Sequence, residues 1–169
     1  MHYSCRLFIG SSPASWSQYW ENEPDDNLTA KIKGHLFGLI STTDNETGRK
    51  ILSEVTNNYY SSTLDLPVVP NNIDMALAII KADSLNVITT NTKILLKRGD
   101  KISFIPSNSV GQLCDGDQFM MMTNRFLEMF SLEKIKQYLS QSSLQLIEES
   151  FLADLNSFTD QTSIAAALI

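Results

Sequence analysis

The sequence predicts an α+β domain in which antiparallel strands are flanked by helices. Three observations lead to this class. Short apolar runs separated by turn residues crowd the middle of the chain, which is typical of an antiparallel meander. Amphipathic patterns at helical spacing stand on either side of that region. No repeat, low-complexity tract or charged linker interrupts the 169 residues, so we expect residues 1–169 to form one domain.

The amino-terminal part of the chain begins with two strand candidates. Residues 5–9 are mostly apolar and lead into Gly-Ser-Ser-Pro, which indicates a strand followed by a turn. The aromatic and acidic stretch over residues 16–27 is interpreted as an irregular connection. Residues 35–40 are nearly continuously apolar and stop at a polar run, which is the pattern of a buried strand.

A helix is expected over residues 45–60. Thr43 and Glu46 have capping-box spacing, in which a hydroxyl and a carboxylate satisfy free backbone N–H groups. Apolar residues then recur at helical spacing. Two prolines in the following segment, residues 64–72, exclude a helix interior or a central strand there. That segment is therefore predicted to be a surface connection.

The rest of the chain continues as strands and helices. Turn signals separate four short strand candidates, at residues 75–81, 86–89, 94–97 and 102–105. Residues 119–122 form a further strand candidate, and Ser131 can cap the helix that follows it. A second amphipathic helix is expected over about residues 144–155. The apolar segment at residues 163–169 is expected to close the fold as a core strand.

The composition argues against several classes of function. The formal net charge is −6, and the basic residues are scattered along the chain, which disfavours binding to nucleic acid or to an anionic membrane. Cys5 and Cys114 are too few for a disulfide framework or a thiolate zinc site. The amino terminus lacks the pattern of a secretory signal, and no apolar run reaches the length of a membrane span. A cytoplasmic location is expected.

Residues 116–125 carry the most informative pattern. They read Gly-Asp-Gln-Phe-Met-Met-Met-Thr-Asn-Arg and are followed by Leu-Glu-Met-Phe-Ser at residues 127–131. This run resembles the PP2C-type metal-dependent Ser/Thr phosphatases, in which a Gly-Asp turn leads into a buried strand that ends in Ser-Asp-Gly. The resemblance implies an α/β/β/α sandwich of two antiparallel sheets flanked by helices, here reduced in size. The aspartate of the triplet binds metal in that family, and Asn124 stands in its place here.

Three further segments resemble motifs of the same family, in the same order. The strand before the first helix is similar to one that ends in Asp-Gly, whose aspartate bridges two metals, and Ser41 and Thr42 replace that pair. The segment around Asn91 is similar to a Gly-Asp-Ser-Arg strand, with Asn91 in place of the aspartate. The segment that begins at Asp160 resembles the terminal Asp-Asn motif, and Asp160 keeps its carboxylate.

The family's earliest motif, an Arg followed by Asn-Glu-Asp, is similar to the acidic run at residues 22–26. Asp25 or Asp26 is then the counterpart of its aspartate, and we take Asp26 with Asp160 as the vestigial metal set. The same aspartates are also explained as solvated loop acids, as most exposed aspartates are. The arginine that would clamp a substrate phosphate has no visible counterpart near this run.

These departures predict a pseudophosphatase. Two divalent ions held a few ångströms apart need several carboxylates, and the neutral side chains of Ser41 and Asn124 cannot supply that charge. We therefore expect no bound cofactor and no catalysis. The expected role is that of a regulatory module in intracellular signalling, which binds a protein partner that is a phosphoprotein or is linked to a kinase.

Two alternatives stay open. A weakly active metal-dependent protein Ser/Thr phosphatase would hold one Mn²⁺ or Mg²⁺ through Asp160, one of Asp25 and Asp26, and Asp44 on the loop that starts the helix. A chain whose resemblance is coincidental would instead be another small sandwich with a structural or assembly role. Metal-dependent hydrolysis that is abolished by Asp160→Ala would support the first alternative.

Overall fold

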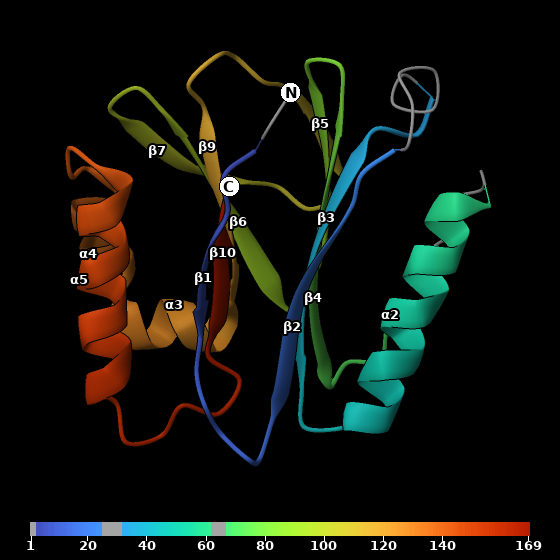
Figure 1. The fold of residues 1–169 in the computed structure, drawn as a ribbon, viewed down its shortest axis with the longest axis horizontal. Coiled ribbons are helices and arrows are strands. Elements are labelled where there is room, and N and C mark those ends of the chain that lie inside the picture. Colours follow the sequence, from blue (N-terminus) through green and yellow to red (C-terminus); the bar gives the residue numbers. More distant parts are fainter. Residues whose placement is uncertain (1–2, 25–31, 62–66) are drawn as a thin grey trace.

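The computed structural model describes residues 3–24, 32–61 and 67–169 and shows an α/β/β/α sandwich (Figure 1). Two five-stranded sheets pack face to face, and every strand pairing is antiparallel. Sheet A has the spatial order β1 (Arg6–Ile9), β10 (Ala165–Leu168), β9 (Gln118–Thr123), β6 (Thr92–Arg98) and β7 (Lys101–Ile105). Sheet B has the order β2 (Trp16–Asn22), β3 (His35–Thr42), β4 (Ile73–Lys81), β5 (Ser84–Thr90) and β8 (Ser109–Gln112). The predicted fold class is confirmed.

Helices lie on the outer faces of both sheets (Figure 1). Sheet B is covered by α2 (Asn45–Tyr60), and sheet A is covered by α3 (Asn124–Phe130), α4 (Leu132–Leu139) and α5 (Leu144–Ser157). Within the described residues, none of these helices has the length and apolar character needed to cross a membrane.

Three apolar layers hold the sandwich together. Side chains alternate between the two faces of a strand, so each buried strand contributes to two layers. Leu39 and Met121 meet between the sheets, Phe126 and Phe151 pack in the layer between sheet A and its helices, and Ile40 packs under α2. Because both faces of these strands are covered, their sequences are almost continuously apolar instead of alternating.

The helix predicted over residues 45–60 is confirmed as α2, but its cap differs from the prediction. The N-cap is Asp44, whose carboxylate accepts hydrogen bonds from the Thr47 N–H at 3.1 Å and from the Thr47 hydroxyl at 2.7 Å. Thr43, predicted to form the capping box, is exposed. An aspartate in this place supplies the capping oxygen together with a negative charge, which the helix N-terminus favours.

Two strands differ from the prediction. Residues 16–22 form β2 instead of an irregular connection, and residues 109–112 form β8 where no strand is expected from the sequence. Both lie at an edge of sheet B and pair on one side among the described residues. An edge strand carries polar and exposed side chains, which hide its alternating pattern. β2 is nevertheless anchored, since Trp20 is buried beneath α2.

Candidate functional site at the motif end

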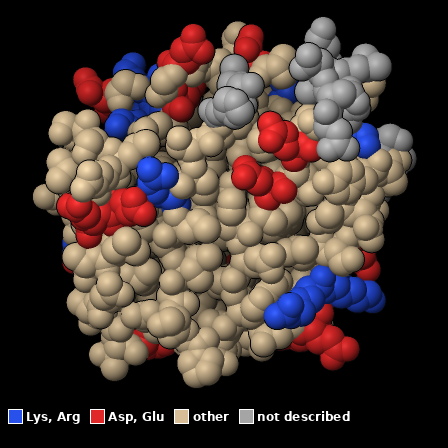
Figure 2. All heavy atoms as spheres, viewed as in Figure 1, with Lys and Arg blue, Asp and Glu red and all other residues tan. Residues whose placement is uncertain are grey.

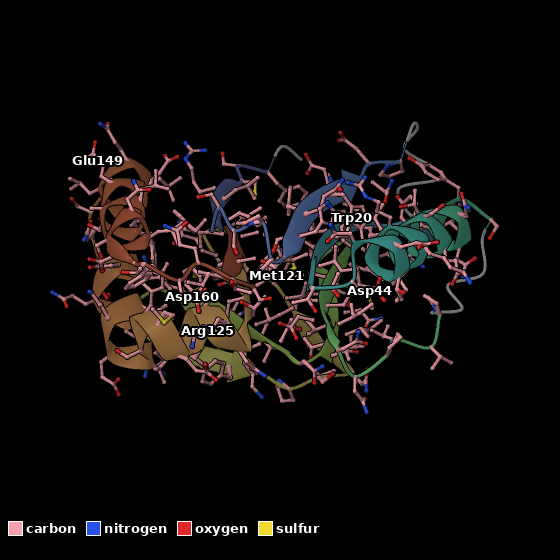
Figure 3. The ribbon with its side chains drawn as sticks, turned by 90° about the horizontal axis from the view of Figure 1, so that it is seen from below. Trp20, Asp44, Met121, Arg125, Glu149 and Asp160 are labelled. Carbon is pink, nitrogen blue, oxygen red and sulfur yellow. The ribbon has the colours of Figure 1, made fainter. Side chains whose placement is uncertain are left out.

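The segments that carry the phosphatase-like motifs meet at one end of the sandwich, which we call the motif end. β3 and β9 finish there, while β4, β6 and β10 begin there, because neighbouring strands are antiparallel. Figure 3 views the molecule from this end, with Arg125 and Asp160 close together near α3 and Asp44 at the start of α2. Strand order in the sheets thus gathers residues that are far apart in the sequence.

Five polar side chains form the inner floor of the motif end. On sheet B, Ser17, Ser41 and Asp74 stand opposite one another across β2, β3 and β4. On sheet A, Thr92 stands opposite Thr123. Counting by twos from core residues of the same strands places all five on the face between the sheets. The floor therefore presents four hydroxyls and one carboxylate.

Three of the floor hydroxyls come from Ser17, Ser41 and Thr92. The Ser17 hydroxyl donates to Ser41 Oγ at 2.8 Å, and Ser41 is buried. The Thr92 hydroxyl donates to the carbonyl oxygen of Met75 at 2.7 Å, which links β6 of sheet A to β4 of sheet B. These hydroxyls therefore satisfy one another or the backbone, as buried polar groups generally do.

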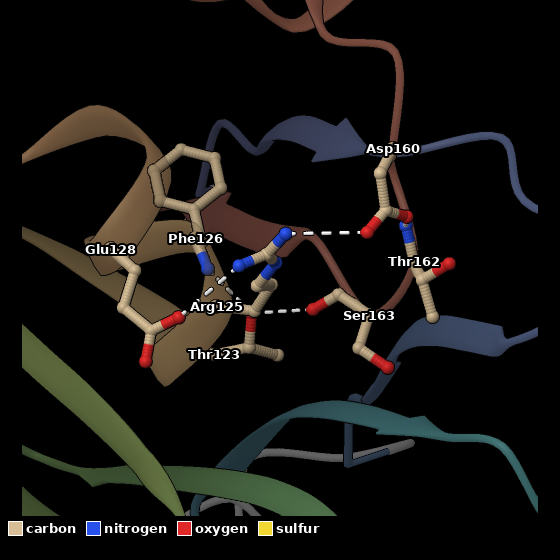
Figure 4. A network of polar contacts seen from close by, with 7 residues as sticks. All are labelled: Thr123, Arg125, Phe126, Glu128, Asp160, Thr162 and Ser163. Atoms are coloured by element: carbon tan, nitrogen blue, oxygen red, sulfur yellow. Dashed lines mark hydrogen bonds and ion pairs between the residues drawn. The ribbon is translucent and has the colours of Figure 1, made fainter.

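The fourth floor hydroxyl, that of Thr123 on sheet A, is also satisfied by hydrogen bonds to the backbone. It is fully buried and caps α3, since its Oγ1 accepts a hydrogen bond from the Phe126 N–H at 3.1 Å. The same hydroxyl donates to the carbonyl oxygen of Ser163 at 2.8 Å (Figure 4). One threonine thus joins the end of β9, the start of α3 and the loop before β10.

Asp74 is the one carboxylate of the floor, and the sequence interpretation missed it. Its side chain is partly buried between the sheets, and among the described residues no hydrogen bond or ion pair to it is found. Burial raises the pKa of this carboxyl to about 6. The strand was predicted to start at Met75, two residues after its observed start at Ile73, so Asp74 was left outside it. The available signal is the spacing of two residues that puts Asp74 on the same face of the strand as Ala76 and Ala78.

Asp160 lies at the motif end but is held differently. One of its oxygens accepts a hydrogen bond from the Thr162 N–H at 2.9 Å, and the other is 3.3 Å from Arg125 Nη2 (Figure 4). The hydrogen bonds from Thr162, followed by the positive charge of Arg125, lower the pKa of Asp160. Arg125 also lies 3.4 Å from the Glu128 carboxylate. A permanent guanidinium charge thus stands next to the aspartate that the family resemblance retains.

Asn91 and Asn124, which stand where the family has aspartate, both lie at the motif end. Asn91 occupies the turn between β5 and β6 with a φ of 53°, a conformation that asparagine tolerates. Its amide donates to the carbonyl oxygens of Asn71 at 2.7 Å and Ile73 at 3.3 Å. Asn124 is the exposed first residue of α3. Asn91 therefore holds a turn, and Asn124 starts a helix.

One predicted metal ligand, Asp26, is not placed by the structure. Asp26, like Asp25, lies outside the described residues. Strand pairing puts Ser17 opposite Ser41, while Asn22 at the other end of β2 pairs with Leu36. The position across from Ser41 is therefore a second serine.

The described donors do not fit a pair of divalent ions. Among residues 3–24, 32–61 and 67–169, no group of three or more His, Cys, Asp and Glu side chains is placed to hold a metal ion. The Asp44 carboxylate is used in capping α2, and hydrogen bonds from Thr47 lower its pKa. Asp160 is paired with a cation, which leaves Asp74 as the floor carboxylate without a described partner.

The charged side chains on the face seen in Figure 2 are spread out. On the face shown in Figure 2, the described Lys and Arg side chains lie in separate places and form no continuous patch. Salt bridges among the described residues are local, such as the one between Arg98 and Asp117 at 2.6 Å. At the motif end, Asp74 and Asp160 differ most in their electrostatic surroundings, because Asp74 has no described partner and Asp160 is paired with Arg125.

Known structures share this fold. No protein-family model and no curated protein matches the sequence. The SiaA PP2C domain of Pseudomonas aeruginosa superposes with a TM-score of 0.70 at 13% identity, over 97% of this chain and 84% of that one. A serine/threonine phosphatase of S. agalactiae gives 0.65 at 11% identity, over 98% of both chains. The catalytic domain of the phosphatase PstP, solved with two manganese ions, gives 0.57 at 8% identity, over 91% of this chain and 97% of that one. The chain has the PP2C-type phosphatase fold.

Proposed function

We propose that the protein is a pseudophosphatase, a PP2C-like module that binds a protein partner in intracellular signalling and does not hydrolyse phosphoesters. The observation that carries the proposal is the ion pair between Arg125 and Asp160. In the motif that Asp160 matches, a carboxylate serves a divalent cation. Here a guanidinium occupies the cation's role as the charge partner of that carboxylate.

The neutral residues at the motif end support the same conclusion. A binuclear site depends on several carboxylates that neutralise two double charges and lower the pKa of a shared water. Ser41, Asn91 and Asn124 supply none of that charge. In addition, the hydroxyl oxygens of Ser17 and Ser41 are in direct contact at 2.8 Å, so no ligand stands between them.

The fold motivates a proposal for the class of partner. Two of the superposable domains are named as serine/threonine phosphatases, a class of enzyme that acts on phosphorylated protein. We propose that the partner is a phosphoprotein or a kinase-linked protein in the cytoplasm. A domain of this fold that lacks the metal-binding charge would bind such a partner without hydrolysing its phosphate.

A second function has one observation in its favour. Asp74 is a carboxylate of the inner floor with no described partner, and such a group is available to bind a cation. One Mn²⁺ or Mg²⁺ held by Asp74 or Asp160 would give a weakly active phosphatase. The pKa of about 6 means that Asp74 is ionised above that pH, as a ligand must be.

Calorimetric titration of Mn²⁺ and Mg²⁺ into chelator-treated protein, with aryl-phosphate hydrolysis on the same sample, separates the two functions. We expect neither heat of binding nor metal-dependent turnover. Asp74→Asn and Asp160→Ala are the test variants, and Asp83→Asn, in an exposed turn at the other end of β4, is the matched control. Micromolar binding with turnover that disappears in either test variant and persists in the control would contradict the pseudophosphatase.

A further inference from the structure

The two sheets are covered unequally. Among the described residues, α3, α4 and α5 lie on the outer face of sheet A, whereas α2 lies on that of sheet B (Figure 1). The strands that α2 contacts most are β2 and β3, at one side of the sheet. At the other side, Ile88 of β5 still packs against the apolar layer under α2, whereas Val110 of β8 is largely exposed.

A groove lies on this part of sheet B. The register places Ile79, Asn86 and Val110 in one row across β4, β5 and β8, on the same face as α2. Tyr59, near the end of α2, and Ile32 complete the apolar lining of a hollow of about 320 Å³. The groove is thus bounded by a helix on one side and an edge strand on the other.

Two of the exposed side chains in the groove are apolar. Val110 is 70% exposed although it belongs to a strand, and Ile32 is 59% exposed. Val110 also borders a second hollow, formed around the turn between β4 and β5. Large apolar side chains that stand on a hollow, and not singly on a convex surface, are typical of sites where another protein packs.

The charge of the groove is opposite to that of the chain. Lys33 and Lys81 line it, and among the described residues no aspartate or glutamate does, although the chain as a whole carries a net charge of −6. Lys33 is fixed in place, because its ammonium donates to the Tyr60 carbonyl oxygen at 2.5 Å and lies 5.8 Å from the centre of the Tyr59 ring. The groove therefore selects for negative charge beside apolar surface.

We infer that this groove receives an amphipathic helix of a partner protein, with apolar residues on one face and acidic residues along its flanks. Helices bind apolar grooves through residues at helical spacing, and complementary charge at the rim orients them. The helix would lie beside α2 and cover Val110. This inference rests on the proposed protein-binding role, but it is independent of whether the motif end hydrolyses phosphate.

The test uses a labelled synthetic helix of about 18 residues with leucines on one face and glutamates on both flanks. A matched peptide has lysine at each glutamate position. We expect micromolar binding of the acidic peptide in fluorescence anisotropy, about tenfold weaker binding of the basic one, and backbone amide NMR shifts centred on Asn86 and Val110. Binding of both peptides with equal affinity, or of neither at about 1 mM, would overturn the inference.

Variants locate the binding. Val110→Asp and Lys81→Glu are expected to weaken the acidic peptide about fivefold or more each, and Lys81→Glu should improve binding of the basic peptide. The controls are Phe104→Asp and Lys101→Glu, which introduce the same acidic residues at exposed positions of β7 in sheet A and should leave affinity unchanged. Equal loss in the controls would contradict the proposed site.

Sedimentation velocity separates a partner helix from a second copy of the chain. Leu146 and Leu152 are exposed on α5, whose sequence is acidic, so a second copy has a helix of the right character to offer. We expect the wild-type protein to remain monomeric over the concentrations used for the peptide. A dimer that is lost in Val110→Asp would assign the groove to self-association and overturn the partner. The metal and hydrolysis assays would be unaffected by either result.

Discussion

Two carboxylates at the motif end, Asp160 beside sheet A and Asp74 on sheet B, have opposite environments. Asp160, beside sheet A, is 62% exposed, accepts a hydrogen bond from Thr162 and pairs with Arg125, and its pKa is lowered. Asp74, on sheet B, faces the space between the sheets without a described partner, and burial raises its pKa to about 6. The charge of Asp160 is thus neutralised at the surface by Arg125. Burial makes ionisation of Asp74 energetically unfavourable.

This contrast shows which of the two carboxylates is available to bind a metal ion. Asp160 matches a family motif, yet its arrangement is complete without any ligand. Asp74 matches no motif that the sequence resembles, yet an ionised carboxylate with no partner is costly inside a protein. Groups held in this way are enriched at functional sites. The metal titration is therefore aimed as much at Asp74 as at Asp160.

The largest effect is expected for Thr123→Val, which keeps the shape of the side chain and removes its hydroxyl. The Phe126 N–H loses its cap and the Ser163 carbonyl loses a donor, so we expect a loss of about 2–3 kcal/mol in the free energy of unfolding. Urea denaturation measures it. Thr43→Val, at an exposed residue, is the control and should change stability by less than about 0.5 kcal/mol. Equal effects would mean that the Thr123 hydroxyl does not hold this end together.

A smaller effect, of opposite sign, is expected for Asp74→Asn. The folded-state pKa of Asp74 lies above the usual 3.8, so the folded protein binds the proton more tightly, and stability falls as pH rises from about 4 to 7. Removing the charge should therefore stabilise the protein above pH 7 and have no effect near pH 4. Since the group is only partly buried, we expect about 1 kcal/mol.

Paired urea titrations at the two pH values test the sign of this effect. The variant should be more stable than the wild type at the higher pH and equally stable at the lower one. Asp83→Asn, which removes an exposed turn carboxylate at the far end of β4, controls for the change in net charge. A destabilised Asp74→Asn protein at neutral pH would mean that the ionised carboxylate has a favourable partner.

The fold could be predicted because its central strands are apolar on both faces. β3, β4 and β9 are continuous apolar runs, and each ends at a polar or turn residue. β2 and β8 lie at sheet edges, where the partner strand that makes them regular is distant in the sequence. The resemblance in motif order supplied the two-sheet sandwich, which periodicity alone does not determine.

The sequence interpretation named residues of the candidate site only where motifs mark strand ends. Ser41, Asn91, Asn124 and Asp160 lie at one end of the sandwich, as motif order indicates. The ion pair with Arg125 was missed because it depends on how the loop before β10 passes α3. Ser17 was missed because it belongs to an edge strand that was not predicted. In both cases the decisive contact joins residues that no local pattern connects.

The smallest effect is expected for Arg125→Gln, which removes the cation beside Asp160. The pair is exposed and its atoms are 3.3 Å apart, so it adds little to stability. The favourable contribution is present where Asp160 is ionised and is lost as pH falls through its lowered pKa. The melting temperature of the variant should therefore lie slightly below that of the wild type at pH 7, and the difference should vanish in acid or at high salt. Arg125→Lys keeps the positive charge and should retain most of the stabilising contribution of the pair. If Arg125→Gln instead gains Mn²⁺ binding that Asp160→Ala then abolishes, the guanidinium of Arg125 is what keeps a cation from Asp160. Asp160 would then be a metal ligand blocked by Arg125, whereas Asp74 is a ligand without a described partner.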